Sequence, residues 1–558
     1  MNKAPAVHAE PLVALVIFTM VSLGLGVVAN LVASRKAGFL QKYFLGNRSL
    51  GAFAVALTAA VMSGGTFMGF PSLVYKFGWV VGLWICSYMI APLTVLGVLG
   101  KRIGQLSRKT GAITLPDLFR ERYGSPALGL MTSLLVIFFL TCNLVPQFKA
   151  GGLIMKIVLP SETVNWFVTE ESPATAELGY YLGLAIFATT VIAYTTYGGF
   201  LAAIWTDVFQ SVVMAVGVLI LFPLAIYHSG GLAKATLAGI AQTDPGFAFG
   251  PGAIRDFHPI GLAFSFFFMW AITGMGQPST MVRLMAFRDS RTLRYSILYL
   301  TLYNFVIYVP LIMIFIAARS ILPDLPNTDE VMPRLVLALA NPYVAGLILA
   351  APYGAVMSTV SGFLLIVASG LVRDIYQRFL RPAASEREIE WASYGATVGV
   401  GLVAAALAVR PPQYLQLIIV FSSAGMASAF LAPGLLGAFW RRATHQGAIA
   451  AMATGASATL GLYLYGLLLG WRGYDPMIGA GGKAFVPYYL FGIDPCVWGM
   501  TSSLVSGILV SLLSPPPDPA RVSLLFDAQP PGAPAPATLD SHPEPRVKPA
   551  SAGERHPR

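Results

Sequence analysis

Two adjacent hydroxyl side chains are the residues with the clearest capacity to bind an ion. Ser358 and Thr359 lie in the apolar run Ala355-Val-Met-Ser-Thr359, where one helical turn could present both oxygens. Oxygen ligands suit a hard cation such as sodium. Serine and threonine in membrane helices also bond to carbonyls of their own helix. The pair by itself therefore leaves both roles open.

Glycine and proline interrupt two apolar segments, and each interruption could free backbone groups to hold an ion or a polar solute. The first segment runs from Ala59 to Pro71 and the second from Thr273 to Ser279. The residues that weaken the two helices are Gly64, Gly65, Pro71, Gly274, Gly276 and Pro278. Such residues can also serve only close helix packing. Because the two breaks occur at matching positions five helices apart, we favour a functional role.

The sequence shows no residue pattern for enzyme catalysis. It contains neither a His-Glu-x-x-His motif nor a phosphate-binding loop that ends in Gly-Lys-Ser/Thr. The three cysteines, Cys86, Cys142 and Cys496, lack metal-ligand and disulfide spacing. We therefore expect no enzyme activity, no cofactor and no metal other than sodium, and an ion gradient as the energy source for transport.

The composition places these residues in a membrane. Of the 558 residues, 56% are hydrophobic and 11% are charged, against about 25% charged residues in a soluble domain. A helix needs about 20 apolar residues to cross the hydrocarbon core. The sequence predicts an all-α bundle of about thirteen transmembrane helices, at residues 11–33, 51–76, 78–101, 128–157, 179–198, 201–228, 258–286, 293–319, 343–377, 391–410, 413–440, 446–470 and 486–513.

These spans divide the chain into five parts. An extra helix and its loop occupy residues 1–50, and two C-terminal helices occupy residues 446–513. Between them, residues 51–228 and 258–440 form two five-helix repeats, inverted relative to each other and each opening with a discontinuous helix. The tail 514–558 holds 12 of the 39 prolines in 45 residues, so we expect it to be disordered and too short for a catalytic domain.

The distribution of basic residues predicts the orientation. With the N-terminus outside, the cytoplasmic loops hold 20 Lys and Arg residues and the opposite face holds 10. Cytoplasmic loops of membrane proteins carry the excess of Lys and Arg. We therefore expect an integral protein of the cell (inner) membrane, with its N-terminus outside and its C-terminus in the cytoplasm. The net charge of +11 needs no nucleic-acid partner to explain it.

Several segments resemble the sodium/solute symporter family. The segment Tyr194-Thr-Thr-Tyr-Gly-Gly-Phe-Leu-Ala-Ala-Ile-Trp-Thr-Asp-Val-Phe-Gln210 is similar to the family signature, and Ala355–Thr359 followed by Asp374-Ile-Tyr376 is similar to its second hallmark. The resemblance runs from about Tyr43 to Arg442 and is nearest to the sodium/pantothenate permease branch. It implies the inverted-repeat fold and sodium-coupled import of a small organic solute by alternating access.

The resemblance also implies a sodium site between the first helix of one repeat and the third helix of the other. Its ligands would be the carbonyls of Ala59, Met62 and Ala355 and the hydroxyls of Ser358 and Thr359. Asp207 matches a family acid near the cytoplasmic sodium exit. A carboxylate near a helix N-terminus is also favoured by the helix dipole alone, so both roles stay open for Asp207.

The solute is less closely defined. Where the proline permease branch has Asp and Trp, this chain has Val61 and Gly65, which favours pantothenate or another small monocarboxylate over proline. The candidate solute contacts are Ser63, Gly64, Gly65, Gln147, Lys149, Gly274 and Gln277. Lys149 could pair with a substrate carboxylate or extend to the outer membrane interface.

Alternatives to this function are a proline-type or other solute symporter of the same family, a membrane sensor built on a transporter bundle, and a solute channel. A sensor would need an output domain, which the short tail does not supply, and a channel would not need an occludable sodium site. The expected partners are the solute, sodium and the lipid bilayer, with no obligate protein partner.

Overall fold

The structure is a computed structural model, and it describes residues 9–32, 56–57, 62–160, 173–249, 260–287, 289–323, 325–412, 414–473 and 485–527. The described residues form helices and no strand. The expected all-α class is therefore confirmed.

Ten helical stretches are long and apolar enough to cross a membrane, within the residues that the structure describes. They are Glu10–Val28, Trp79–Thr110, Pro126–Val158, Glu177–Gly199, Ala203–Ser229, Ser290–Ile321, Pro342–Leu380, Leu415–Phe439, His445–Gly470 and Pro495–Leu513. The bent pair Ile260–Gly276 and Pro278–Ala286 makes eleven if it is one span.

Ten or eleven of the thirteen expected spans thus have a counterpart of this kind. The expected span 51–76 lies partly outside the described residues, and its described part is interrupted. The expected span 391–410 corresponds to α17 (Glu386–Leu407), a continuous helix of 22 residues that is not among the ten. The count of thirteen and the inverted repeat stay predictions.

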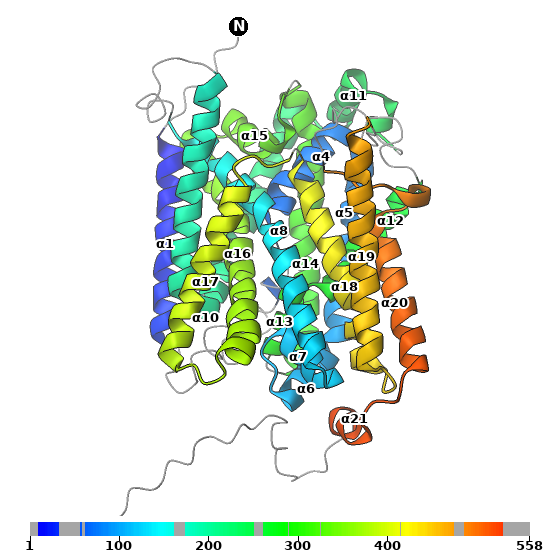
Figure 1. Cartoon of the computed structure of the whole chain (residues 1–558). Coiled ribbons are helices and arrows are strands. Elements are labelled where there is room, and N and C mark those ends of the chain that lie inside the picture. Colours follow the sequence, from blue (N-terminus) through cyan, green and yellow to red (C-terminus); the bar gives the residue numbers. More distant parts are fainter. Residues whose placement is uncertain are drawn as a thin grey trace, which may run out of the picture.

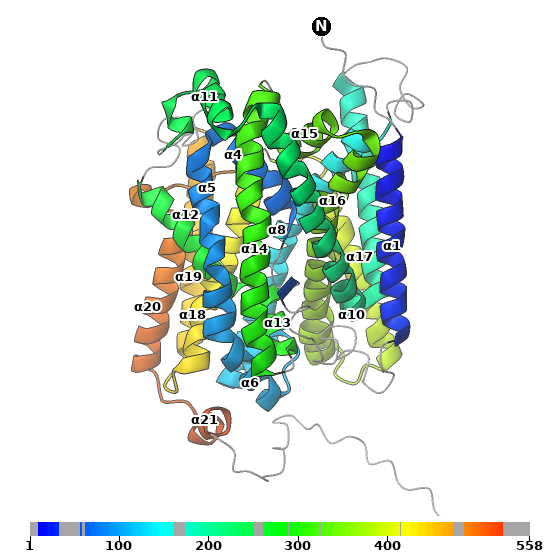
Figure 2. The same cartoon turned by 180° about the vertical axis from the view of Figure 1, so that it is seen from behind.

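The bundle has a buried centre and an apolar rim. The centre is formed by α16 (Pro342–Ser369) and α18 (Leu415–Phe439), since the most apolar window of α18 is wholly buried. The rim includes α1 (Glu10–Val32), α19 (His445–Gly470) and α20 (Pro495–Leu513); α1 and α20 lie at opposite edges (Figures 1 and 2). Exposed apolar side chains on α1, such as Ile17 and Met20, suit contact with lipid.

A glycine separates the two spans within the long helical stretch α10 (Pro173–Ser229). Gly199 has φ 63° and ψ −169° there, a conformation that side chains with a Cβ rarely adopt. The break directs Glu177–Gly199 and Ala203–Ser229 as separate helices. The predicted signature segment, which ends at Gln210, therefore contains a chain turn as well as Asp207.

The two ends of the bundle carry different short helices. One end carries α11 (Leu232–Gln242) and α15 (Val331–Leu339), and the other carries α6 (Lys101–Thr110), α7 (Leu115–Tyr123) and α21 (Pro519–Phe526) (Figures 1 and 2). Helix α1 begins at the first end, and α21 lies at the second. The described chain thus starts and finishes at opposite ends of the bundle, although the face toward the cytoplasm stays a prediction.

The expectation of a disordered tail is wrong for residues 519–526, which form α21. Leu525 is buried, and the Lys109 ammonium donates to the carbonyls of Leu524 and Leu525 at 3.0 and 3.2 Å. The Phe526 ring lies within about 5.5 Å of the guanidinium groups of Arg102, Arg122 and Arg441. Composition predicted disorder because it does not register that these arginines offer the segment a surface. Residues 528–558 lie outside the described part.

The docking of α21 predicts slow proteolysis at Arg521. Its guanidinium donates to the Glu121 carbonyl at 3.0 Å, so trypsin should cut after Arg521 only when α21 detaches. Replacing buried Leu525 with Ala removes apolar packing and should speed this cut several-fold. Leu513→Ala, at a side chain that is 86% exposed, serves as the control. Equal cleavage rates in the two variants, measured by mass spectrometry, would contradict the docking.

Candidate functional site

The first break lies between Leu57 and α4 (Phe70–Phe77). Met62 and Ser63 are not helical, and a wide helical turn (Gly65–Gly69) leads into α4. The Gly64 N–H donates to Gln147 Oε1 at 2.8 Å, and the Gly65 N–H donates to Ser63 Oγ at 3.1 Å. Side chains therefore replace the missing helical bonds, as buried backbone groups require.

Close packing explains why Gly64 and Gly65 are glycines. A Cβ on Gly64 would lie 2.9 Å from the Ala150 Cβ and from Gln147 Oε1. A Cβ on Gly65 would lie 2.8 Å from Ile419 Cδ1. The packing role and the helix break thus coincide at these two positions. Ala59 and Val61 lie outside the described residues.

The second break has the expected position. Helix α12 (Ile260–Ile272) passes into a short turn (Thr273–Gly276), and α13 (Pro278–Ala286) follows at an angle of 49°. Gln277 is extended between the two, with φ −79° and ψ 120°. Proline at the first position of α13 suits a new helix start, because its missing N–H would have no helical partner there.

Oxygen atoms from the first break and from α16 meet at one point. Thr359 Oγ1 donates to the Met62 carbonyl at 2.9 Å and to the Ala355 carbonyl at 3.0 Å. Ser358 Oγ donates to the same Ala355 carbonyl at 3.0 Å. The structure therefore brings together four of the five residues predicted as sodium ligands; the fifth is Ala59, which lies outside the described residues.

A small cavity of about 20 Å³ adjoins these oxygens. Met62, Ser358 and Thr359 line it together with Asp207 and Arg283. Arg283 Nη2 lies 3.6 Å from Asp207 Oδ2, and Asp207 Oδ1 has no hydrogen-bond partner among the described residues. Asp207 thus lies beside the oxygen cluster, where a cation leaving the cluster would meet a carboxylate.

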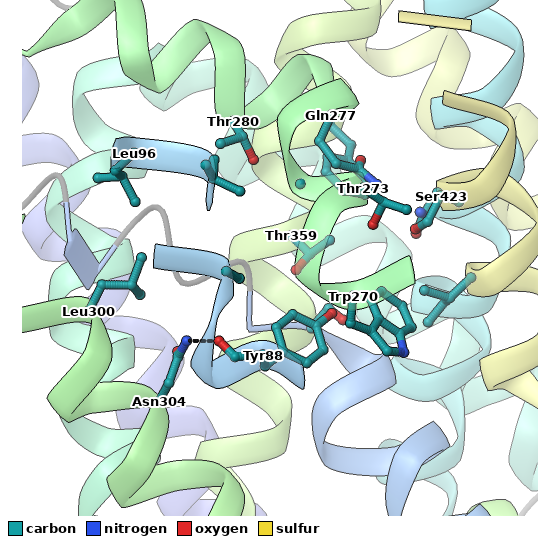
Figure 3. Close-up of a pocket in the computed structure, with 17 residues that line it drawn as sticks. Tyr88, Leu96, Trp270, Thr273, Gln277, Thr280, Leu300, Asn304, Thr359 and Ser423 are labelled. Atoms are coloured by element: carbon teal, nitrogen blue, oxygen red, sulfur yellow. Dashed lines mark hydrogen bonds between the residues drawn. The ribbon is translucent and has the colours of Figure 1, made fainter. Parts of the chain in front are cut away.

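A larger cavity of about 80 Å³ lies on the other side of Thr359. Since about 10–15 Å³ suffices for one water molecule, this space can take several waters or part of a small solute. Of the predicted solute contacts, Ser63, Gly274 and Gln277 line it. Figure 3 shows Thr359 between Asn304 and Leu300 on one side and Thr273, Gln277 and Ser423 on the other.

The sequence analysis missed most residues of this larger cavity. Tyr88, Trp270, Thr280, Asn304 and Ser423 come from five separate elements. Trp270 lies three residues before Thr273, so helical spacing could have linked it to the second break. The others carry no such signal. None of the 17 residues drawn around the cavity in Figure 3 has a charged side chain.

Gln147 and Lys149 lie outside this lining. Gln147 bonds to Gly64 as described above. The Lys149 ammonium lies 2.7 Å from Asp329 Oδ2 and donates to the Pro412 carbonyl at 2.9 Å. Only 8% of the Lys149 side chain is exposed, so it does not extend to the membrane interface in this conformation. The acidic partner could not be predicted, because Asp329 lies 180 residues away.

Comparison with known proteins agrees with this architecture. Residues 43–455 match the sodium:solute symporter family, which is most of the chain. The chain belongs to the sodium:solute symporter family. The predicted family is thereby confirmed, over nearly the same residues as the sequence resemblance.

Individual symporters are similar over most of their length. The chain is 32% identical to the sodium/pantothenate symporter of Haemophilus influenzae, over 82% of this chain and 90% of that protein. It is 30% identical to the sodium/pantothenate symporter of Escherichia coli, over 84% and 93%, and 32% identical to the sodium/proline symporter of Haemophilus influenzae, over 79% and 86%.

A solved structure of a Na+-coupled sialic acid symporter in a substrate-bound, outward-open state has a similar fold. The TM-score is 0.64 at 17% identity, and the alignment covers 91% of this chain and 99% of that one. This likeness concerns the fold alone.

The oxygen cluster predicts how sodium dependence responds to mutation. Ser358→Ala with Thr359→Ala removes both hydroxyls and should raise the sodium concentration for half-maximal binding by about tenfold or more, since even outer partners of metal sites contribute this much. Ser369→Ala on the same helix removes a hydroxyl that bonds only to the Ile366 carbonyl and should have no effect. Unchanged sodium affinity in the double variant, measured by calorimetry on purified protein, would remove the site.

Proposed function

We propose that this protein imports a small monocarboxylate, with pantothenate as the leading candidate, by sodium-coupled alternating access. The observation that carries the proposal is the position of Thr359. Its hydroxyl bonds across the first break to Met62, and its side chain lines both the larger cavity and the small one. An ion held there would touch the broken helix, α16 and the edge of the solute space at once.

The proposed sodium ligands are the carbonyls of Ala59, Met62 and Ala355 and the hydroxyls of Ser358 and Thr359. Without an ion, the Thr359 hydroxyl satisfies two of these carbonyls. When sodium binds, the hydroxyl would turn its lone pairs inward, and the carbonyls would coordinate the ion instead. Because the set has no formal charge, the ion stays exchangeable. Sodium and solute would then favour the same arrangement of the first break, which makes their binding cooperative.

The cavity suits a solute with several hydrogen-bonding groups. Hydroxyls and amides from Ser63, Asn143, Gln277, Asn304 and Ser423 face or border it. Support for pantothenate comes from this polar, uncharged lining and from the names of two similar symporters. A proline-type solute is the second candidate, supported by the similarity to a sodium/proline symporter. Neither a membrane sensor nor a channel explains the paired cavities.

Uptake into vesicles tests the proposal. Purified protein in liposomes should accumulate labelled pantothenate when a sodium gradient points inward, and accumulation should stop when potassium replaces sodium. Lactate, pyruvate, acetate and proline complete the panel. If no monocarboxylate accumulates with sodium, the substrate class is wrong. If uptake is equal in potassium, the sodium coupling is wrong.

Asp207 offers a separate test of the sodium exit. If its carboxylate receives the departing ion, Asp207→Asn should lower the turnover rate by about tenfold or more while the affinity for sodium changes little, because a charged hydrogen-bonding group in a buried place contributes strongly. The rate is read from uptake at saturating sodium and solute. If Asp207 serves only its helix dipole, turnover should stay near that of the original protein.

A further inference from the structure

Lys149 takes part in a buried arrangement of donors around one carboxylate oxygen. Asp329 Oδ2 lies 2.7 Å from the Lys149 ammonium and accepts the N–H of Leu415, the first residue of α18, at 3.3 Å. Lys149 and Asp329 are both more than nine-tenths buried. The second oxygen of Asp329 has no hydrogen-bond partner among the described residues.

This donor set is one that binds carboxylates in general. The N-terminus of a long helix attracts anions through its free N–H groups and its dipole, and α18 has 25 residues. A buried lysine adds a full positive charge and a strong hydrogen bond. The side chain of Asp329 therefore shows how a carboxylate fits between Lys149 and α18.

The carboxylate that occupies this arrangement belongs to a connecting segment. Asp329 lies in the short turn Thr328–Glu330, between α14 (Ser290–Ile321) and α15. Polar contacts hold the turn in place: Thr328 and Ser72 share a hydrogen bond of 2.6 Å, and Glu330 accepts from Lys156 at 3.0 Å. Such contacts can break together when the turn moves, and Asp329 would then leave Lys149.

The arrangement lies between one end of the bundle and the larger cavity. Helix α8 (Pro126–Val158) carries both Asn143, which lines that cavity, and Lys149. Six residues separate them, or about 9 Å along a helix. The turn of Asp329 leads directly into α15 at the end of the bundle (Figure 1). A solute coming from this end would meet Lys149 before the cavity.

We propose that Lys149 and the N-terminus of α18 form a carboxylate-binding site on the solute's access route. Asp329 fills this site in the present conformation, and the carboxylate of an incoming solute takes its place when the Thr328–Glu330 turn moves away. The inference rests on the proposed import of a monocarboxylate. It gives the anion a positive partner on the route to a cavity whose described lining has no charge.

A purely structural ion pair makes a different prediction from this exchange. If Lys149 and Asp329 only stabilise the fold, removing either charge should damage binding in the same direction. If Asp329 competes with the solute, Asp329→Asn should strengthen binding of the anion and Lys149→Met should weaken it. The opposite signs separate the two explanations.

The test measures sodium-dependent binding of pantothenate and of its neutral alcohol analogue, panthenol, to the purified full-length protein. We expect the pantothenate Kd to fall about tenfold in Asp329→Asn and to rise about tenfold in Lys149→Met, the size expected for a hydrogen bond to a charged group. The panthenol Kd should change little. Lys234→Met removes an exposed charge at the same end of the bundle and is the control. Changes of the same sign for both variants would overturn the proposal.

A labelling experiment keeps the test independent of the chosen solute. In a protein with all three cysteines replaced by serine, Ser423→Cys places a thiol in the larger cavity. Asp329→Asn should raise its rate of labelling by a membrane-impermeant maleimide from the outside, and propionate should slow this labelling unless Lys149→Met is also present. If pantothenate does not bind, the substrate proposal fails, and propionate protection alone then decides the site. Protection that persists without Lys149 would overturn it.

Discussion

The interruption of one buried helix at Met62–Gly65 is the constraint on which the rest of the structure depends. In hydrocarbon, each freed backbone group must find a partner inside the protein. Gln147 on α8 accepts the Gly64 N–H, and Thr359 on α16 donates to the Met62 carbonyl. Helices α8 and α16 must therefore lie beside the break, and they are among the best buried helices of the bundle.

The same constraint explains where charge is found. The oxygen cluster and the larger cavity are neutral, while the described ion pairs of the core lie away from them or at the edge. Asp207 and Arg283 flank the small cavity, Lys149 and Asp329 lie toward one end of the bundle, and Asp117 pairs with Arg378 toward the other. Burial raises the pKa of Asp117, although Arg373 opposes this effect. A buried charge without its partner is costly, so each pair resists separation of the elements that it joins.

Similar reasoning separates the residues that were predictable from those that were not. Ser358, Thr359 and the two breaks carry local signals, because glycine, proline and paired hydroxyls act within one or two helical turns. Lys149 carried only half of its signal: a lysine in an apolar span requires a partner or an exit to water, but sequence spacing does not indicate Asp329. Tail residues 519–526 misled in the opposite direction, because proline content predicted disorder while Leu525 and Phe526 found a surface on α6 and α7.

The sequence by itself determined the solvent of this protein, its helical class, its two helix breaks and its family, since each follows from composition or from short motifs. The tertiary structure decided which groups meet. It placed Thr359 against Met62, Asp207 against Arg283, and Tyr88, Trp270 and Asn304 around one cavity. These residues lie on helices far apart in the chain, and their contacts depend on how whole helices pack. No local pattern of side chains encodes that packing.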